Sequence, residues 1–197
     1  MLKAIETRYK GYRFRSRLEA RWAVFFDALG VGWEYEKEGF ELISGRYLPD
    51  FWLPDVYDRS GQSGVWVEIK GQEPNQKELD LCEQLAIESG HSSNLFVGLP
   101  DPDDCNNGHQ WTYHAPTDKE MAEWRCTPSP LPEAWQDFGM VFHHCFDCRL
   151  TKIEFSNDYY TCFRCKRQTC TWSDEKLYQA FNYAKSARFE YGETPRI

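Results

Sequence analysis

Hydrophobic positions spaced three or four residues apart mark two helices in the first half of the chain. The first helix is predicted over residues 17–29, between Ser16 as N-cap and Gly30 as C-cap. The second is predicted over residues 77–89 and ends before Gly90. Their apolar positions are Leu18, Trp22, Phe25 and Leu29 in the first helix and Leu81, Leu85 and Ile87 in the second. Each helix therefore presents one apolar face to a core.

Four short runs rich in aromatic and β-branched residues predict strands. They cover residues 33–38, 46–53, 65–71 and 94–100. With the helices they give the order α-β-β-β-α-β, in which the second helix crosses over between two strands and allows a parallel pair. The sequence therefore predicts an α/β core with a mixed sheet. Residues 110–116 are a candidate for one more strand, because Trp111 and Tyr113 alternate with polar positions.

A Pro-rich segment, TPSPLPEAW, separates this core from a cysteine-rich tail. We predict a core domain over residues 1–126, a linker over 127–138 and a small tail module over 139–197. The tail ends in a helix predicted over residues 174–189 behind the N-cap Ser173.

Composition indicates a folded protein. The 197 residues are 41% hydrophobic and 16% aromatic, which excludes a chain that is disordered throughout. No stretch reaches the roughly 18 uninterrupted apolar residues of a membrane span, and the first residues lack the apolar core of a signal peptide. We therefore expect a cytoplasmic protein with no membrane partner. In a reducing compartment, the eight cysteines favour metal ligation or free thiols over disulfides.

Charge is unevenly distributed along the chain. The net charge of −8 and the pI near 5.2 argue against a uniformly basic surface. Residues 73–137 hold thirteen acids against three basic residues, whereas the first 21 residues hold seven basic residues against two acids. The basic residues of that first segment are Lys3, Arg8, Lys10, Arg13, Arg15, Arg17 and Arg21. A local basic face for phosphate groups is therefore expected there.

Charged residues occupy one face of the third predicted strand. Glu68 and Lys70 are two positions apart, so both project from the face opposite Val67 and Ile69. Two charged groups in the middle of a sheet lose solvation unless they pair or bind something. The pattern therefore predicts a partner or ligand on that face.

A second carboxylate is placed to join this pair. Asp50 follows Pro49 in the neighbouring strand and should emerge at a strand end beside Glu68. Converging carboxylates repel unless a hard cation lies between them, and Mg²⁺ suits one or two carboxylates with waters and a phosphate oxygen. Lys70 would orient the attacking water or stabilise transition-state charge, while Glu19 would add a ligand from the first helix.

A resemblance to a known family rests on three motifs in order, RSRLEARW, YLPDFWLP and VWVEIKG. Residues 10–100 resemble the PD-(D/E)xK nuclease superfamily, and the helix glutamate resembles its phage endonuclease I and Holliday-junction resolvase branches. The resemblance implies a restriction-endonuclease-like αβββαβ core and Mg²⁺-dependent hydrolysis of DNA phosphodiesters. It implies Asp50 and Glu68 as metal ligands, the Ile69 carbonyl as a further ligand, Lys70 as the catalytic lysine and Glu19 as the helix acid.

Arginines lie on both sides of the helix glutamate. Arg13, Arg15, Arg17 and Arg21 are expected to contact phosphates around the cut. Two other interpretations of Asp50, Glu68 and Lys70 stay open. Glu68 and Lys70 can simply belong to a solvated strand face, or the domain can be an inactive copy of a nuclease.

Two Cys-x₂-Cys pairs in the tail have the spacing of zinc knuckles. They are Cys145 with Cys148 and Cys162 with Cys165, at the two ends of a hairpin-like segment over residues 149–161. Together they complete a tetrahedral Cys₄ site with no open position, which is typical of structural Zn²⁺. The segment resembles a zinc ribbon. His143, His144 and Cys170 are substitute ligands that two complete pairs disfavour.

Basic residues of the tail, Arg164, Lys166 and Arg167, alternate with aromatic ones and suit contact with phosphates and bases, or form a solvated surface. Cys82 is expected in the core. Four further residues, Cys105, His109, His114 and Cys126, match no ligand pattern and are expected in loops.

The sequence as a whole predicts a cytoplasmic, Mg²⁺-dependent DNA endonuclease whose first domain cuts and whose zinc tail helps to hold DNA. The resemblance includes structure-selective and phage-related enzymes. The alternative is a non-catalytic zinc-ribbon protein that binds DNA or another protein on an inactive nuclease scaffold. DNA is the expected partner, and a homodimer is one arrangement in which the chain would bind it.

Overall fold

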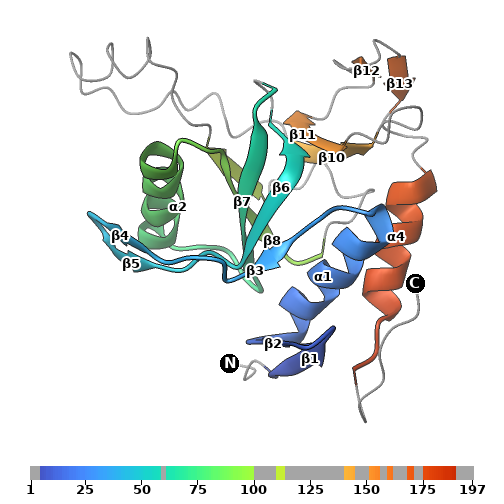
Figure 1. The fold of residues 1–197 in the computed structure, drawn as a ribbon, viewed down its shortest axis with the longest axis horizontal. Coiled ribbons are helices and arrows are strands. Elements are labelled where there is room, and N and C mark those ends of the chain that lie inside the picture. The colour runs from blue at the N-terminus through green and yellow to red at the C-terminus, as the bar shows by residue number, and fades with distance from the viewer. Residues whose placement is uncertain are drawn as a thin grey trace.

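A computed structural model describes residues 5–58, 61–99, 110–113, 140–144, 151–155, 159–161, 168–170 and 175–189. Within these ranges the fold is mixed α/β, with three helices and one large mixed sheet (Figure 1). The helices are α1 (Arg17–Leu29), α2 (Gln76–Ser89) and α4 (Glu175–Ser186). None of these described helices is long and apolar enough to cross a membrane. The predicted α/β class is confirmed.

The large sheet has seven strands and is built around β6 and β7. Its path is β10-β11-β6-β7-β8-β9, and β3 pairs with β6 off this path. The strands are β3 (Glu34–Tyr35), β6 (Phe51–Tyr57), β7 (Ser63–Lys70), β8 (Ser93–Val97), β9 (Gln110–Tyr113), β10 (Met140–His144) and β11 (Thr151–Phe155). The β11–β6 and β7–β8 pairs are parallel, and the others are antiparallel. The parallel β7–β8 pair confirms the crossover predicted for the helix between them, α2.

Three two-stranded sheets stand apart from the large one. They are β1 (Thr7–Tyr9) with β2 (Tyr12–Phe14), β4 (Phe40–Leu42) with β5 (Gly45–Tyr47), and β12 (Tyr159–Thr161) with β13 (Gln168–Cys170). The β4–β5 hairpin is fixed to α2, because Gln84 accepts a hydrogen bond from the Ser44 backbone and donates one to its hydroxyl.

The first two helices begin and end close to their predicted caps. Ser16 accepts a hydrogen bond from the Glu19 backbone at 3.2 Å, and Gly30 ends α1 with a φ of 73°. Gly90 likewise ends α2 with a φ of 69°. The N-cap of α2 is Asn75, so the helix begins one residue earlier than predicted.

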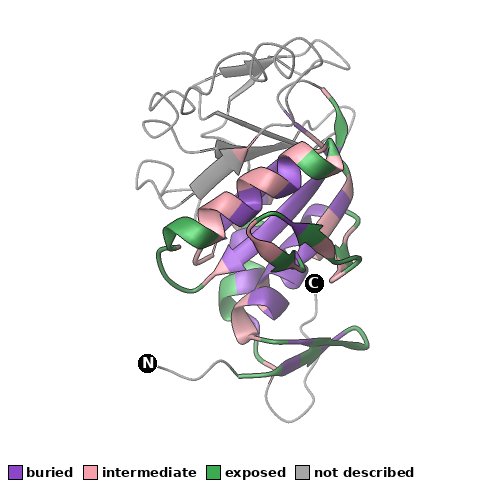
Figure 2. Cartoon of the chain, turned by 90° about the vertical axis from the view of Figure 1, so that its left-hand side faces the viewer, coloured by how far each residue is buried: buried purple, intermediate pink, exposed green. Residues whose placement is uncertain are grey.

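Helices cover both faces of the sheet. α1 and α4 lie side by side on one face, and α2 with the β4–β5 hairpin lies on the other (Figure 1). Phe26 and Phe181 share a core cluster with Val67 of β7, whereas Leu85 packs in a separate cluster with Trp66. Figure 2 shows that buried residues concentrate where these helices meet the sheet. Alternation along β7 therefore directs Trp66, and with it the other even-numbered residues, toward the α2 side.

The prediction of a single strand over residues 46–53 was wrong, because the structure divides this segment between two strands. β5 ends at Tyr47, β6 begins at Phe51, and the Pro-Asp step lies between them. β6 then continues through Pro54 to Tyr57, with a register shift between Leu53 and Tyr57. The shift accommodates a proline, which cannot donate to the ladder.

Elements of the predicted tail lie against the core. β11 pairs with β6 through Thr151 opposite Val56, and α4 packs on α1. The hairpin expected over residues 149–161 is not formed, because its two strands, β11 and β12, do not pair with each other. β11 pairs with β10 and β6, and β12 pairs with β13. The long-range contacts that decide these pairings leave no local pattern in the sequence.

Candidate active site

Asp50 and Glu68 lie opposite each other where β6 and β7 meet. Phe51 faces Val67 across the antiparallel pair, so the preceding Asp50 reaches the level of Glu68. The Ile69 backbone donates a hydrogen bond to Asp50 Oδ2 at 2.7 Å, which fixes the orientation of that carboxylate. Asp50 is 2% exposed and Glu68 is 6% exposed. The two predicted carboxylates are therefore brought together in a buried position at a strand end.

Lys70 lies between two glutamates. Its Nζ is 2.9 Å from Glu68 Oε1 and 2.9 Å from Glu78 Oε1. Glu78 belongs to the first turn of α2, where its other oxygen accepts a hydrogen bond from the Asn75 backbone. Lys70 is thus tied both to the strand that carries it and to the start of the next helix.

Glu19 lies at the first turn of α1 and is 7% exposed. Its carboxylate accepts hydrogen bonds from the Ser16 hydroxyl at 2.6 Å, from the Tyr35 hydroxyl at 2.5 Å and from the Arg15 backbone at 3.1 Å. Its charge acts on Asp50 and helps to raise the pKa of that carboxyl group. The helix glutamate therefore lies in the same electrostatic cluster as Asp50, held there by three donors.

Arg15 supplies a positive charge to this cluster. Its Nη2 lies 2.5 Å from Asp50 Oδ1, and its Nε lies 2.8 Å from Glu36 Oε1. These contacts, which outweigh the effect of burial, raise the pKa of the guanidinium. The sequence placed Arg15 on a DNA-binding face, whereas the structure pairs it with a predicted metal ligand.

Burial shifts the protonation of both carboxylates. It raises the pKa of Asp50 well above its usual range, and the charges of Glu68 and Glu19 raise it further, against the opposing effects of the Ile69 backbone and Arg15. Burial likewise raises the pKa of Glu68, although Lys70 opposes the shift. The folded chain therefore favours the uncharged form of carboxyl groups that it holds close together.

Glu68 has one oxygen, Oε2, that forms no hydrogen bond of normal geometry with a described group, and the buried hydroxyl of Tyr47 forms none either. The two groups are neighbours, because Tyr47 lowers the pKa of Glu68, while burial, Cys82, Glu68 and Asp50 raise the pKa of Tyr47. A buried carboxylate oxygen without a partner costs free energy unless a ligand binds it. The buried position of Glu68 Oε2 therefore favours a bound cation.

The donor set suits a hard cation. In the described part of the chain, no group of three or more Asp, Glu, His and Cys side chains is gathered tightly enough to hold a metal ion by itself. Mg²⁺ needs only one or two carboxylates, because waters and a substrate phosphate complete its octahedron. Asp50 and Glu68, with the unsatisfied Oε2, meet that smaller requirement.

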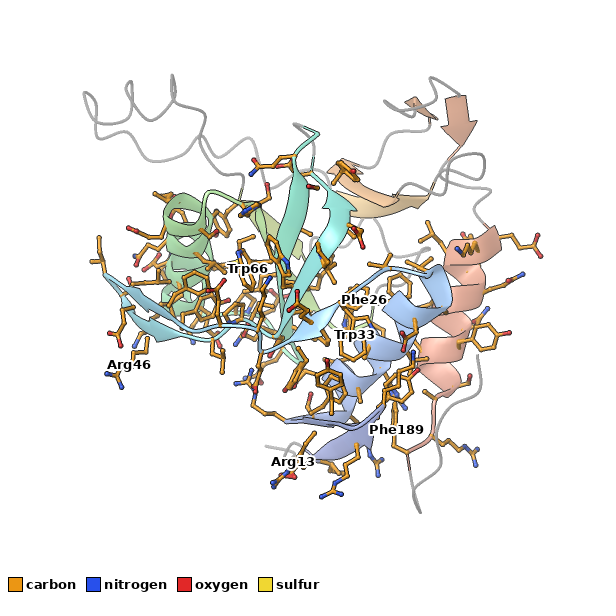
Figure 3. The ribbon with its side chains drawn as sticks, viewed as in Figure 1. Arg13, Phe26, Trp33, Arg46, Trp66 and Phe189 are labelled. Atoms are coloured by element: carbon orange, nitrogen blue, oxygen red, sulfur yellow. The ribbon has the colours of Figure 1, made fainter. Side chains whose placement is uncertain are left out.

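The other arginines of the N-terminal segment have different surroundings. Arg13 forms an exposed ion pair with Glu6, and Figure 3 shows its side chain at the outer edge of the β1–β2 hairpin. Arg17 and Arg21 lie half-buried on α1. Arg21 Nε is buried, with no hydrogen-bond partner among the described residues. Among Arg13, Arg15, Arg17 and Arg21, two are therefore exposed: Arg13 on the hairpin, and Arg15 in the cluster with Asp50.

Several predicted residues fall outside the described ranges. They are the zinc ligands Cys145, Cys148, Cys162 and Cys165, the basic residues Arg164, Lys166 and Arg167, and the loop residues Cys105, His109, His114 and Cys126. Cys82 is described and is fully buried, where its thiol contacts the Ser93 hydroxyl at 2.8 Å. Burial raises the pKa of the Cys82 thiol to about 12, so its predicted core position is confirmed.

Sequence reasoning missed three residues of the site: Arg15 as the partner of Asp50, Glu78 as the partner of Lys70, and Tyr47 beside Glu68. The spacing of Asn75 and Glu78 is that of a capping box and would have placed Glu78 at the third helical position. No local signal marks Arg15 or Tyr47, because their contacts join segments that are far apart in the sequence.

Comparisons of this chain with protein-family models, with curated proteins and with solved structures find no match.

Proposed function

We propose that the chain is a Mg²⁺-dependent endonuclease that hydrolyses DNA phosphodiester bonds at Asp50, Glu68 and Lys70. The observation that carries the proposal is the buried Glu68 Oε2 without a partner, beside a second buried carboxylate and a lysine. Such a cluster is costly for folding, and a cation with a phosphate ligand would satisfy it. In this proposal, residues 10–100 form a restriction-endonuclease-like core.

Each residue of the site has a distinct task in this reaction. A Mg²⁺ ion held by Asp50 and Glu68, with the Ile69 carbonyl as a further ligand, would polarise the phosphoryl oxygen and lower the pKa of a bound water. The Ile69 backbone fixes the orientation of the Asp50 carboxylate, so Oδ1, which Arg15 contacts, does not need to reorient. Lys70 Nζ, whose pKa is raised by Glu68 and Glu78 against the effect of burial, keeps its proton and donates to a phosphate oxygen. Glu19 sets the charge around Asp50.

The proposed tail module holds one structural Zn²⁺ through Cys145, Cys148, Cys162 and Cys165. Support comes from the strands around these residues: the first pair falls between β10 and β11, and the second between β12 and β13. Both strand pairs are antiparallel, and zinc knuckles occur at the turns of such hairpins. The basic residues beside the second pair would contact the DNA backbone.

A cleavage assay tests the enzymatic proposal. Duplex, single-stranded and branched DNA are incubated with Mg²⁺ and with wild type, Asp50→Ala or Lys70→Ala. We expect cleavage by the wild type, and a loss of about 100-fold or more in each variant, because each removes charge stabilisation of the transition state. Glu41→Ala is the matched control, since Glu41 is an exposed acid on the β4–β5 hairpin. If no substrate is cut faster by the wild type than by the two site variants, the proposal fails.

One observation favours the second candidate function, a non-catalytic zinc-ribbon protein that binds DNA or protein. Arg15 already neutralises Asp50, as expected of a nuclease scaffold that has lost its cation. The same assay separates the two functions, because this scaffold would bind DNA and yield no product with any of the three substrates.

A further inference from the structure

Arg15 occupies the one oxygen of Asp50 that a cation would use. Oδ2 is taken by the Ile69 backbone at 2.7 Å, and Oδ1 is taken by Arg15 Nη2 at 2.5 Å. A backbone donor inside a sheet cannot move without breaking strand pairing. A cation that approaches Oδ1 therefore meets the positive charge of the guanidinium there and competes with it for that oxygen.

The side chain of Arg15 is free to leave while its backbone stays in place. Its side chain is 54% exposed, although the Asp50 side chain beneath it is 3% exposed. The Arg15 backbone is anchored separately, because it donates to Glu19 Oε2 and to the Tyr35 hydroxyl. Rotation about side-chain bonds therefore moves the guanidinium to solvent without moving the backbone of α1 or β3, and it breaks the ion pair with Glu36 as well as the one with Asp50.

We propose that Arg15 is an exchangeable internal counter-cation, which neutralises Asp50 when no divalent cation is bound and is released to bind substrate phosphate when one enters. This inference rests on the proposed metal site and adds the residue that couples metal binding to DNA binding. Without a cation, Arg15 offsets the cost of a buried carboxylate. Released, it lies beside the bound cation, and a guanidinium is suited to a phosphate oxygen.

The exchange predicts a specific effect on cation affinity. Arg15→Gln removes the competitor, so the divalent-cation affinity of the full chain should rise about tenfold, a size common for coupling between neighbouring sites. Arg15→Lys keeps a competing charge and should stay close to the wild type. Arg13→Gln is the matched control, because it makes the same charge change at an exposed residue whose partner is Glu6. Isothermal titration with Mg²⁺ and with Mn²⁺ measures all four proteins without DNA.

A second measurement follows the released guanidinium. The affinity for a duplex oligonucleotide is measured with and without Ca²⁺, over times too short for cleavage. Arg15→Gln should weaken DNA binding about tenfold with Ca²⁺ present and change it little without Ca²⁺, because reciprocal coupling requires that Arg15 be free only in the loaded state. Arg13→Gln should weaken binding equally under both conditions.

The outcomes separate this inference from the proposed cleavage. Unchanged or weaker cation binding by Arg15→Gln, relative to Arg13→Gln, overturns the exchange and leaves the cleavage assay unaffected. Binding by Arg15→Gln alone supports the exchange, and binding by neither protein overturns it. In both cases the cleavage assay decides cleavage, because a DNA phosphate completes the coordination of the cation. Tighter binding by Arg15→Gln together with wild-type cleavage supports both proposals.

Discussion

At the residue scale, the central fact is a buried carboxylate pair with fewer positive partners than it needs. Asp50 has Arg15, and Glu68 has Lys70 on one oxygen only. The pKa of each carboxyl group is raised because a negative charge is unfavourable in this buried position. A protein that served stability alone would place apolar or amide groups at these positions. The cluster is therefore evidence for a ligand and also a source of instability.

Glu68→Gln should stabilise the chain in the absence of divalent cations. The amide oxygen can still accept from Lys70, and the amide nitrogen can donate toward the unsatisfied hydroxyl of Tyr47. We expect a gain on the order of 1 kcal/mol in the free energy of unfolding near neutral pH, the size common for satisfying one buried polar group. Chemical denaturation measures it, and Glu41→Gln, an exposed acid, is the control.

The stabilisation by Glu68→Gln should depend on pH with a definite sign. Because the pKa of Glu68 is raised in the folded state, its stabilising contribution is present below the pKa of the unfolded chain and is lost as pH rises through the folded value. The advantage of the glutamine variant should therefore grow as pH rises above the pKa of the unfolded chain. An advantage that shrinks as pH rises would contradict the buried state of the Glu68 carboxyl group.

At the element scale, the start of α2 and the end of β7 form one unit. Glu78 closes the capping box with Asn75 and also holds Lys70. The side-chain half of a capping box and the position of Lys70, the proposed catalytic lysine, thus depend on one carboxylate. The parallel β7–β8 pair positions both, because it requires α2 to cross over beside the end of β7.

Two substitutions at Glu78 should separate its roles. Glu78→Ala removes the lysine partner and the carboxylate that accepts from the Asn75 backbone, while Asn75 still accepts from the backbone of residue 78. It should cost about 1 kcal/mol of stability as well as slowing DNA cleavage. Glu78→Gln retains the cap, because glutamine serves at this position of a capping box, but it removes the charge beside Lys70. We expect near-wild-type unfolding and slower cleavage for glutamine. Equal cleavage by Glu78→Gln and wild type would show that Lys70 needs only Glu68.

The elements differ in how far the sequence predicts them, for physical reasons. α1 and α2 were predicted almost to the residue, because caps such as Ser16, Gly30 and Gly90 are local signals. β6 was misplaced, because Pro54 reads as a strand end and is accommodated only by the irregular pairing with β7. Asp50 was placed beside Glu68 because Pro49 favours a strand start, and the pairing of Phe51 with Val67 brings the two carboxylates together. The Arg15 contact is tertiary, and alternation along a strand does not encode it.

At the scale of the whole molecule, the last helix completes the core of the first. Leu177, Ala180, Phe181 and Ala184 of α4 belong to the cluster that contains the inner face of α1. Lys176 also donates to the Leu29 carbonyl at the end of α1, at 2.6 Å. The helix that positions Glu19 is therefore supported by residues more than a hundred positions away in the sequence.

Phe181→Ala should destabilise the whole N-terminal core. The side chain is 8% exposed and packs in the shared cluster, so its loss should cost about 3 kcal/mol. Tyr183→Ala is the control on the same helix, since Tyr183 is 43% exposed and should cost less than about 0.5 kcal/mol. Denaturant unfolding followed by tryptophan fluorescence measures both. Equal losses would mean that α4 does not support the core in solution.

Zinc removal should reach beyond the tail, because β10 and β11, the strands on either side of the first cysteine pair, belong to the large sheet. β11 follows the first pair and lies parallel to β6, where Thr151 is opposite Val56. We expect the purified chain to hold about one zinc ion, Cys162→Ser to lose it, and unfolding of that variant to begin at lower denaturant concentration. Cys82→Ala, at a buried thiol away from the tail, should keep its zinc. Elemental analysis that finds no zinc in the wild type, or equal zinc in Cys162→Ser, would refute the zinc site. Zinc loss without a change in unfolding would show that β11 stays paired with β6 without the metal.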